Sequence, residues 1–165
     1  MAEMITFTGV WVDPSKIRSD QVRIEDIAHH LSMLCRWGGA VREFYSVAQH
    51  SVRVSRLCDP SDALWGLLHD AAEAYVGDMI RPMKDALRRH TVVFSHIEEA
   101  VMLQVCAQFD LPNEMPLSVK EADEAAWREE MAALTHGGDG GVDMTPLSPQ
   151  EAEREFLSRY EELTR

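Results

Sequence analysis

Apolar residues recur three or four positions apart along most of the chain, which is the spacing of one face of an α-helix. Gly38 and Gly39 end the first stretch, and the Asp59-Pro60 pair ends the second. Gly77 ends the third stretch. The pattern predicts helices over residues 24–35, 47–58, 64–76, 82–87, 93–105, 119–134 and 149–163. It contains no convincing pair of strands.

The arrangement of these segments predicts an all-α fold, a helical bundle of about seven helices in a single domain over residues 1–165. Ser148, Pro149 and Glu151 give the last helix an N-cap, a first-turn proline and a capping-box acid. The run HGGDGGVD, residues 136–143, holds four glycines and predicts a flexible loop.

Composition favours a soluble protein of a reducing compartment. No uninterrupted apolar run approaches the roughly 20 residues that a membrane span needs. The start MAEMITFTGV lacks the features of a secretory signal, so we expect a cytoplasmic protein with no membrane partner. Cys35, Cys58 and Cys106 lie far apart without a CxxC spacing, which favours reduced, mostly buried thiols.

The net charge is −12, from 28 acidic and 16 basic residues. A chain of this sign repels polynucleotide phosphates, so a nucleic acid polymer is an unfavourable partner. A small phosphate ester stays possible, because a metal and a few local cations outweigh the distant field at short range.

Two imidazoles and two carboxylates come from three separate segments: His50, the pair His69-Asp70, and Asp123. Nitrogen and oxygen ligands of this kind suit divalent Zn, Mn, Fe or Co. Taken singly, each histidine is more often a core or surface residue, and only the combination indicates a metal site. A metal held by four such ligands would activate water, and hydrolysis of a phosphate ester is the natural reaction.

Glu73 follows His69 by four residues, so it would point toward the same side if the helix continues, within reach of the metal's water. Asp78, just past the Gly77 turn, is its candidate partner. The plainer alternatives are that Glu73 solvates a helix and that Asp78 serves a turn.

Arg36 and Trp37 end the first helical pattern, where they offer a guanidinium for phosphate and a flat face for a base or sugar. Trp37 is equally compatible with an ordinary core position. Lys84 could meet a phosphate as a point charge. Arg81 and Arg88 flank the same expected helix at positions i and i+7, with Lys84 at i+3, and a solvated face is the plainer interpretation for Arg88.

The motifs CRW, YSVAQHS, LLHDAAEAYVGD, RPMK and VKEAD follow one another between residues 24 and 127. In this order they resemble the HD superfamily of metal-dependent phosphohydrolases, close to bacterial 5′-deoxynucleotidases and phage HD nucleotide hydrolases. The resemblance implies four metal ligands: His50, His69, Asp70 and Asp123. It implies Glu73 as the catalytic acid with Asp78 as its companion. It also implies that Arg36 and Trp37 hold substrate, and it matches Lys84 to a lysine after a proline.

The resemblance further implies one divalent metal ion, Co²⁺, Mn²⁺ or Zn²⁺, and a homo-oligomer. The expected activity is cleavage of the 5′-phosphoester of a deoxynucleotide, releasing deoxynucleoside and phosphate. A deoxynucleoside triphosphate triphosphohydrolase is the first alternative, with Arg81, Lys84 and Arg88 available for two further phosphates. The second alternative is a catalytically silent module that binds nucleotide or metal.

Overall fold

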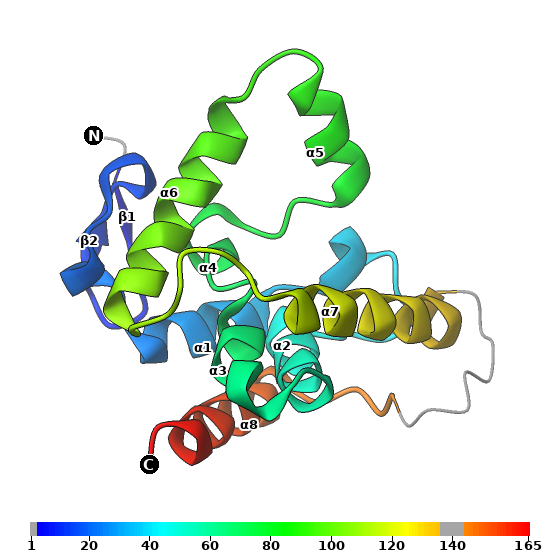
Figure 1. Ribbon diagram of the computed structural model, residues 1–165. Helices are drawn as coiled ribbons and strands as arrows, with labels where there is room; N and C mark the ends of the chain where they lie inside the picture. The colour runs from blue at the N-terminus through cyan, green and yellow to red at the C-terminus, as the bar shows by residue number, and fades with distance from the viewer. Residues whose placement is uncertain (1–2, 136–143) are drawn as a thin grey trace.

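The computed structural model describes residues 3–135 and 144–165 and confirms the all-α fold (Figure 1). Its helices are α1 (Ile24–Met33), α2 (Val47–Leu57), α3 (Ala63–Leu68), α4 (Glu73–Val76), α5 (Arg81–Arg88), α6 (Val93–Gln108), α7 (Leu117–Glu130) and α8 (Pro149–Leu163). A five-residue π-helical turn, Met131–Thr135, continues α7. The predicted glycine loop, residues 136–143, lies outside the described residues.

Helix α2 lies at the centre of the bundle, where it packs against α1, α3, α7 and α8 (Figure 1). Its apolar residues reach the core together with Ile27 and Leu31 from α1, Leu67 and Leu68 from α3, and Phe156 from α8. Buried apolar surface of this kind is the main stabilising contribution in a helical domain. The polar residue at position 50 is therefore carried into the interior by a helix that most of the fold surrounds.

Gly66 allows α3 to approach α2 closely. A Cβ at this position would lie 2.8 Å from Cys58 Sγ and 3.1 Å from the Ser55 Cα. Any larger residue would push the two helices apart, because these neighbours are a buried side chain and backbone. The close approach matters for function, since one candidate ligand lies on α2 and another follows α3.

The N-terminal segment forms a short hairpin that the sequence analysis missed. Strand β1 (Met4–Ile5) pairs antiparallel with β2 (Trp11–Val12), with Met4 opposite Val12. Two residues per strand are too few for an alternating pattern to be recognised in the sequence. The hairpin does not change the fold class.

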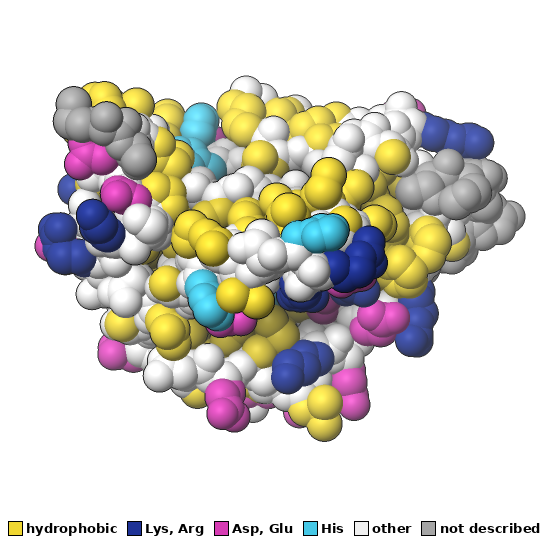
Figure 2. All heavy atoms as spheres, turned by 90° about the horizontal axis from the view of Figure 1, so that it is seen from above, with side chains coloured by type: hydrophobic (Ala, Val, Ile, Leu, Met, Phe, Trp, Pro, Cys, Tyr) yellow, Lys and Arg dark blue, Asp and Glu magenta, His cyan; other side chains and the backbone are white. Residues whose placement is uncertain are grey.

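Helix α5 stands apart from the bundle at the top of Figure 1, joined to the tip of α6. None of its residues is buried against the described part of the chain, although Pro82 occupies the first turn as predicted. Seen from above in Figure 2, basic side chains gather beside a band of apolar ones on this side of the molecule. Helix α5 forms one wall of the pocket described below.

The ends of the helices agree with several local signals. Ser148 accepts from the Glu151 amide, and the Glu151 side chain accepts from the Ser148 amide, so the predicted capping box is present.

Cys58 and Cys106 are buried and free, and Cys35 is half-buried and free, as expected for reduced thiols. No helix in the described part of the chain combines the length and the apolar character that crossing a bilayer requires.

Candidate metal centre and its pocket

His50 and His69 face each other in the interior. The Nε2 atoms of the two rings lie 3.2 Å apart, and both residues are buried. The Nδ1 atom of His50 lies 2.8 Å from Glu130 Oε1, and that of His69 lies 2.8 Å from the Gly66 carbonyl oxygen. Since a carboxylate and a carbonyl only accept, both Nδ1 atoms are donors. In the neutral rings, both Nε2 lone pairs therefore point into the same space.

Two carboxylates border this space. Asp123 Oδ1 lies 3.2 Å from His50 Nε2 and 3.9 Å from His69 Nε2. Asp70 Oδ2 lies 3.1 Å from His69 Nε2 and 3.7 Å from His50 Nε2. Burial alone would lower the pKa of His69, but the carboxylates of Asp70 and Asp123 outweigh it and raise that pKa. A positive charge placed between the two rings and the two carboxylates would therefore be strongly stabilised.

The spacing of these atoms suits a metal ion. Ligand atoms at about 2.1 Å from a metal lie roughly 3.0 Å apart in octahedral and roughly 3.4 Å apart in tetrahedral geometry. The donor atoms of His50, His69 and Asp123 lie within 4.8 Å of one another, so these three residues could hold a metal ion. Asp70 is close enough to join them, and its role as fourth ligand stays a prediction.

The helix predicted through His69 does not continue as expected. Helix α3 ends at Leu68, residues 69–72 form a tight turn, and α4 begins at Glu73. The turn uses bonds three residues back, such as Glu73 N to the Asp70 carbonyl at 2.9 Å. The His69 ring bonds the Gly66 carbonyl, which the Asp70 amide would use in a continuing helix.

Glu73 and Asp78, the two candidate catalytic residues, both line the pocket, and their catalytic role stays a prediction. Burial raises the pKa of Glu73 well above its ordinary value, Asp70 and Asp78 raise it further, and Lys84 opposes them. Burial likewise raises the pKa of Asp78. Glu73 Oε2 is buried and finds no hydrogen-bond partner among the described residues. Such an orphaned carboxyl oxygen suits a group that acts on a bound molecule.

Arg36 and Trp37 lie in a turn and not at the end of a helix, which corrects the sequence analysis. Helix α1 ends at Met33, because the chain then turns into an extended bridge that pairs Cys35 with Ser46. The Arg36 amide donates to the Tyr45 carbonyl at 2.9 Å. Trp37 has a left-handed φ of 61°, an uncommon conformation for a bulky residue that points to a constrained site.

The Arg36 guanidinium reaches the candidate metal centre from this turn. Its Nη1 lies 3.7 Å from Asp70 Oδ2, and its Nη2 donates to Glu130 Oε2 at 3.2 Å. Burial alone would lower the Arg36 pKa, but Glu130 and Asp70 outweigh it, so the group stays charged. Trp37 packs against Trp127 with ring centroids 5.5 Å apart. The structure thus brings an arginine and two aromatic rings to the same pocket.

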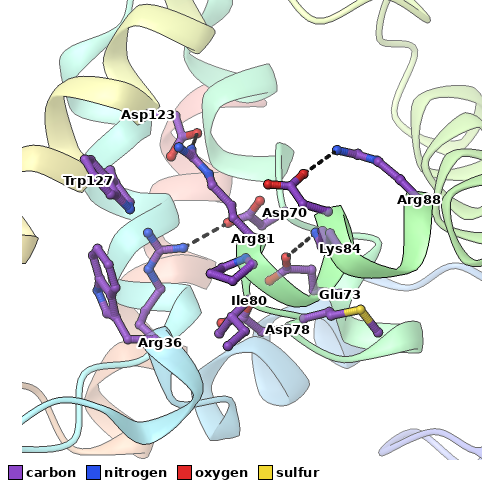
Figure 3. Close-up of a pocket in the computed structure, with 14 residues that line it drawn as sticks. Arg36, Asp70, Glu73, Asp78, Ile80, Arg81, Lys84, Arg88, Asp123 and Trp127 are labelled. Carbon is purple, nitrogen blue, oxygen red and sulfur yellow. Dashed lines mark hydrogen bonds and ion pairs between the residues drawn. The ribbon is translucent and has the colours of Figure 1, made fainter. Parts of the chain in front are cut away.

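The pocket has a volume of about 590 Å³, enough for a nucleotide-sized molecule. Figure 3 shows Arg36 and Trp127 on one side of it and Lys84 and Arg88 on the other. Lys84 Nζ lies 2.7 Å from Glu98 and 3.5 Å from Glu73, so it is already paired with two carboxylates. Lys84 therefore lines the pocket together with Glu73, and its contact with substrate stays a prediction.

The chain is 33% identical over 178 aligned residues to the uncharacterized protein YfdR of Escherichia coli (strain K12), an alignment that covers 99% of this chain and 97% of the relative. The chain belongs to the YfdR family. The uncharacterized protein RCAP_rcc00048 of Rhodobacter capsulatus is 36% identical over 124 residues, 70% of this chain and 60% of that protein. Comparison with models of protein families gave no match. Neither relative's name states an activity.

In this member of the YfdR family, the sequence analysis missed two residues of the site. Glu130 is fully buried and contacts both His50 and Arg36, and Trp127 lies near both the Trp37 ring and the Arg81 guanidinium. Both lie on α7 one or two turns beyond Asp123, on the face of that ligand. The signal that could have found them is this spacing of four and seven residues.

Proposed function

We propose that this protein is a divalent-metal-dependent phosphohydrolase that cleaves the 5′-phosphoester of deoxynucleotides, with monophosphates as the preferred substrates. The observation that carries the proposal is the convergence of the buried His50 and His69 lone pairs with two carboxylates, Asp70 and Asp123, that line a pocket. That pocket also holds the buried carboxyl group of Glu73. The resemblance to HD phosphohydrolases supports the same assignment.

The metal ligands of the proposal are His50, His69, Asp70 and Asp123. When bound, a divalent cation such as Mn²⁺, Co²⁺ or Zn²⁺ polarises a phosphoryl group and favours deprotonation of water. The hydrogen bonds that the two Nδ1 atoms donate to Glu130 and to the Gly66 carbonyl leave both Nε2 atoms free to bind the cation. The donor set of two nitrogens and two carboxylates suits each of these ions.

Side chains of the protein would bind the phosphate and transfer the proton. Arg36, held between Asp70 and Glu130, is positioned to bind the phosphate oxygens. Glu73 carries a proton at a pH where an ordinary carboxyl group has lost it, because its pKa is raised. It can therefore orient the attacking water or protonate the leaving 5′ oxygen as the P–O5′ bond breaks. Asp78 lies close enough to raise the pKa of Glu73 and would share this role.

A base or sugar would lie against the aromatic wall. Trp37 Nε1 is buried and has no hydrogen-bond partner among the described residues, so it can donate to a bound molecule. Trp127 packs against Trp37 at a tilt of 30° and lines the same pocket. Stacking of a base on an aromatic ring tolerates all four bases. We therefore propose that this wall does not select among the four bases.

Charge favours the monophosphate over the triphosphate. Four basic and five acidic side chains line the pocket in the described part of the chain. With Glu73 protonated, as its raised pKa favours, the charges of the other eight cancel, so a bound divalent cation would leave a net charge of about +2, which the two negative charges of a monophosphate balance. The three cations of α5 are already paired: Arg81 with Asp123 and Glu124, Lys84 with Glu98, and Arg88 with Asp85. Triphosphate hydrolysis remains the second candidate, because the same three residues line the pocket.

A product assay tests the proposal. The purified protein is incubated with Mn²⁺ or Co²⁺ and each of the four deoxynucleoside mono- and triphosphates, and nucleoside, phosphate and triphosphate are resolved. Glu73→Ala is the catalytic control, and Glu99→Ala, which makes the same substitution at an exposed residue of α6, is the matched surface control. We expect nucleoside and phosphate from the monophosphates, with loss of turnover only in Glu73→Ala.

The other outcomes are equally informative. Nucleoside together with intact triphosphate would move the assignment to the triphosphohydrolase and give the α5 cations a role. No turnover beyond the Glu73→Ala level with either metal would overturn the proposal in favour of a silent binding module. A homo-oligomer, which the resemblance implies, is tested separately by the mass of the purified protein in solution.

A further inference from the structure

Glu130 is a fully buried carboxylate with three polar contacts. It lies at the end of α7, with none of its surface exposed. Oε1 is 2.8 Å from His50 Nδ1 and 3.3 Å from the Tyr45 hydroxyl oxygen, and Oε2 is 3.2 Å from Arg36 Nη2. A buried carboxylate is costly unless such donors surround it. Its contacts reach two parts of the proposed site at once.

The first contact determines the form of His50. A carboxylate accepts hydrogen bonds, so the His50 proton must lie on Nδ1, and Nε2 is left as a lone pair. That lone pair faces His69 and Asp123. The opposite tautomer would direct an N–H bond into the space that a metal ion would occupy, and it would leave Oε1 of Glu130 without its donor.

The second contact fixes the direction of Arg36. Nη2 is held by Glu130 Oε2, which directs Nη1 toward Asp70 Oδ2 at 3.7 Å. The Arg36 side chain is only 12% exposed, and its Nε has no partner among the described residues, so few other contacts hold it. One carboxylate therefore connects the proposed substrate arginine to a proposed metal ligand.

We propose that Glu130 is a positioning residue that holds His50 in the metal-binding tautomer and Arg36 in the phosphate-binding orientation. The inference rests on the proposed function, since it concerns residues of that site. It goes further, because it makes the affinity for metal and the affinity for substrate depend on the same buried side chain.

Glu130→Gln is a sharp test because an amide has one acceptor and one donor. If its oxygen faces His50, its NH₂ faces Arg36 Nη2, which is also a donor. If its oxygen faces Arg36, its NH₂ faces His50 Nδ1 and favours the wrong tautomer. The variant keeps the volume of the side chain, yet it cannot satisfy both contacts.

The matched control is Glu129→Gln. It removes the same charge from the adjacent residue of α7, whose carboxylate pairs with Arg53 and is 40% exposed. Titration calorimetry gives the Kd for Mn²⁺ and then for whichever deoxynucleoside monophosphate binds the wild type best. Glu130→Gln should raise at least one of these Kd values by about 10- to 100-fold. Glu129→Gln should leave both within about twofold of the wild type.

The outcomes separate the two proposals. If the wild type binds neither Mn²⁺ nor nucleotide, the proposed function fails. If the wild type binds them and a folded Glu130→Gln variant binds both equally well, only the positioning role fails. If Glu130→Gln does not fold, ¹⁵N NMR of the wild-type histidine rings decides the matter, with His50 assigned from the His50→Gln variant. A proton on His50 Nδ1 supports the inference, and a proton on Nε2 overturns it.

Discussion

His50 and His69 face each other through their Nε2 atoms at 3.2 Å, although each ring already donates a hydrogen bond from Nδ1. Two lone pairs at this distance repel each other unless a cation or a proton lies between them. A metal ion should therefore stabilise the folded chain. Free Mn²⁺ at 100 times its Kd should raise the free energy of unfolding by about 2.7 kcal/mol, measured by denaturant titration with and without chelator.

The two histidines supply the control for this prediction. His50→Ala and His69→Ala should each lose the Mn²⁺-dependent increase in the free energy of unfolding. His96→Ala removes an exposed histidine of α6 and should keep it. A metal effect of equal size in all three variants would mean that the cation binds elsewhere.

Glu73→Gln should separate catalysis from metal binding. The substitution removes the ionisable group but leaves the candidate ligands His50, His69 and Asp123 in place. We expect kcat for the best deoxynucleoside monophosphate to fall by about 100-fold or more, which is the usual contribution of a general acid or base. The Kd for Mn²⁺ should change by less than about threefold. A loss of metal binding instead would make Glu73 a ligand.

Trp127→Ala should weaken substrate binding more than turnover. The Trp127 ring packs against Trp37, and the Arg81 guanidinium lies 5.5 Å from its centroid. If a base stacks on this wall, its loss costs about 1–3 kcal/mol, so KM should rise about 5- to 150-fold with a smaller change in kcat. Trp127→Phe should recover most of the loss. The exposed Trp11 provides the control variant Trp11→Ala, which should behave like the wild type.

Gly66→Ala should damage the fold and the site together. The added Cβ would lie 2.8 Å from Cys58 Sγ, so α3 must move away from α2. We expect a loss of about 1–3 kcal/mol in the free energy of unfolding, as for other overpacked cores. The Kd for Mn²⁺ should rise because His50 and His69 lie on either side of this contact. Gly66→Ser should be worse in both measurements, and equal behaviour of the two variants would contradict the steric explanation.

Glu151→Gln should make the stability of α8 less dependent on pH. The hydroxyl and amide of Ser148 lower the pKa of Glu151 in the folded chain. A lowered folded pKa contributes stability above the unfolded pKa, and this contribution is lost as the pH falls through the folded value. The wild type should therefore have a larger free energy of unfolding than Glu151→Gln at pH 7. The difference should shrink below pH 4.5, which is the ordinary pKa of a glutamate side chain. If this difference in the free energy of unfolding instead grew as the pH fell, the pKa of Glu151 would be raised on folding, which would contradict the prediction.

Local signals in the sequence were sufficient for the helices and for their clearest ends. The stripe of apolar residues predicted each of the long helices, and Ser148 with Glu151 predicted the start of α8. These features depend on residues within one or two turns of each other, so they can be recognised without knowing the fold. The turn at residues 69–72 could not, because the His69 side chain competes there with the helix backbone.

For the site, the sequence by itself determined which residue types are available: two histidines, their neighbouring carboxylates, Arg36 and Trp37. Only the tertiary structure decided that His50, His69 and Asp123 meet, because they belong to separate segments that pack around α2. It also decided that Glu130 lies behind His50 and Arg36, a contact across 80 and 94 residues of chain. Such contacts depend on how helices pack, and no periodicity within one segment encodes them.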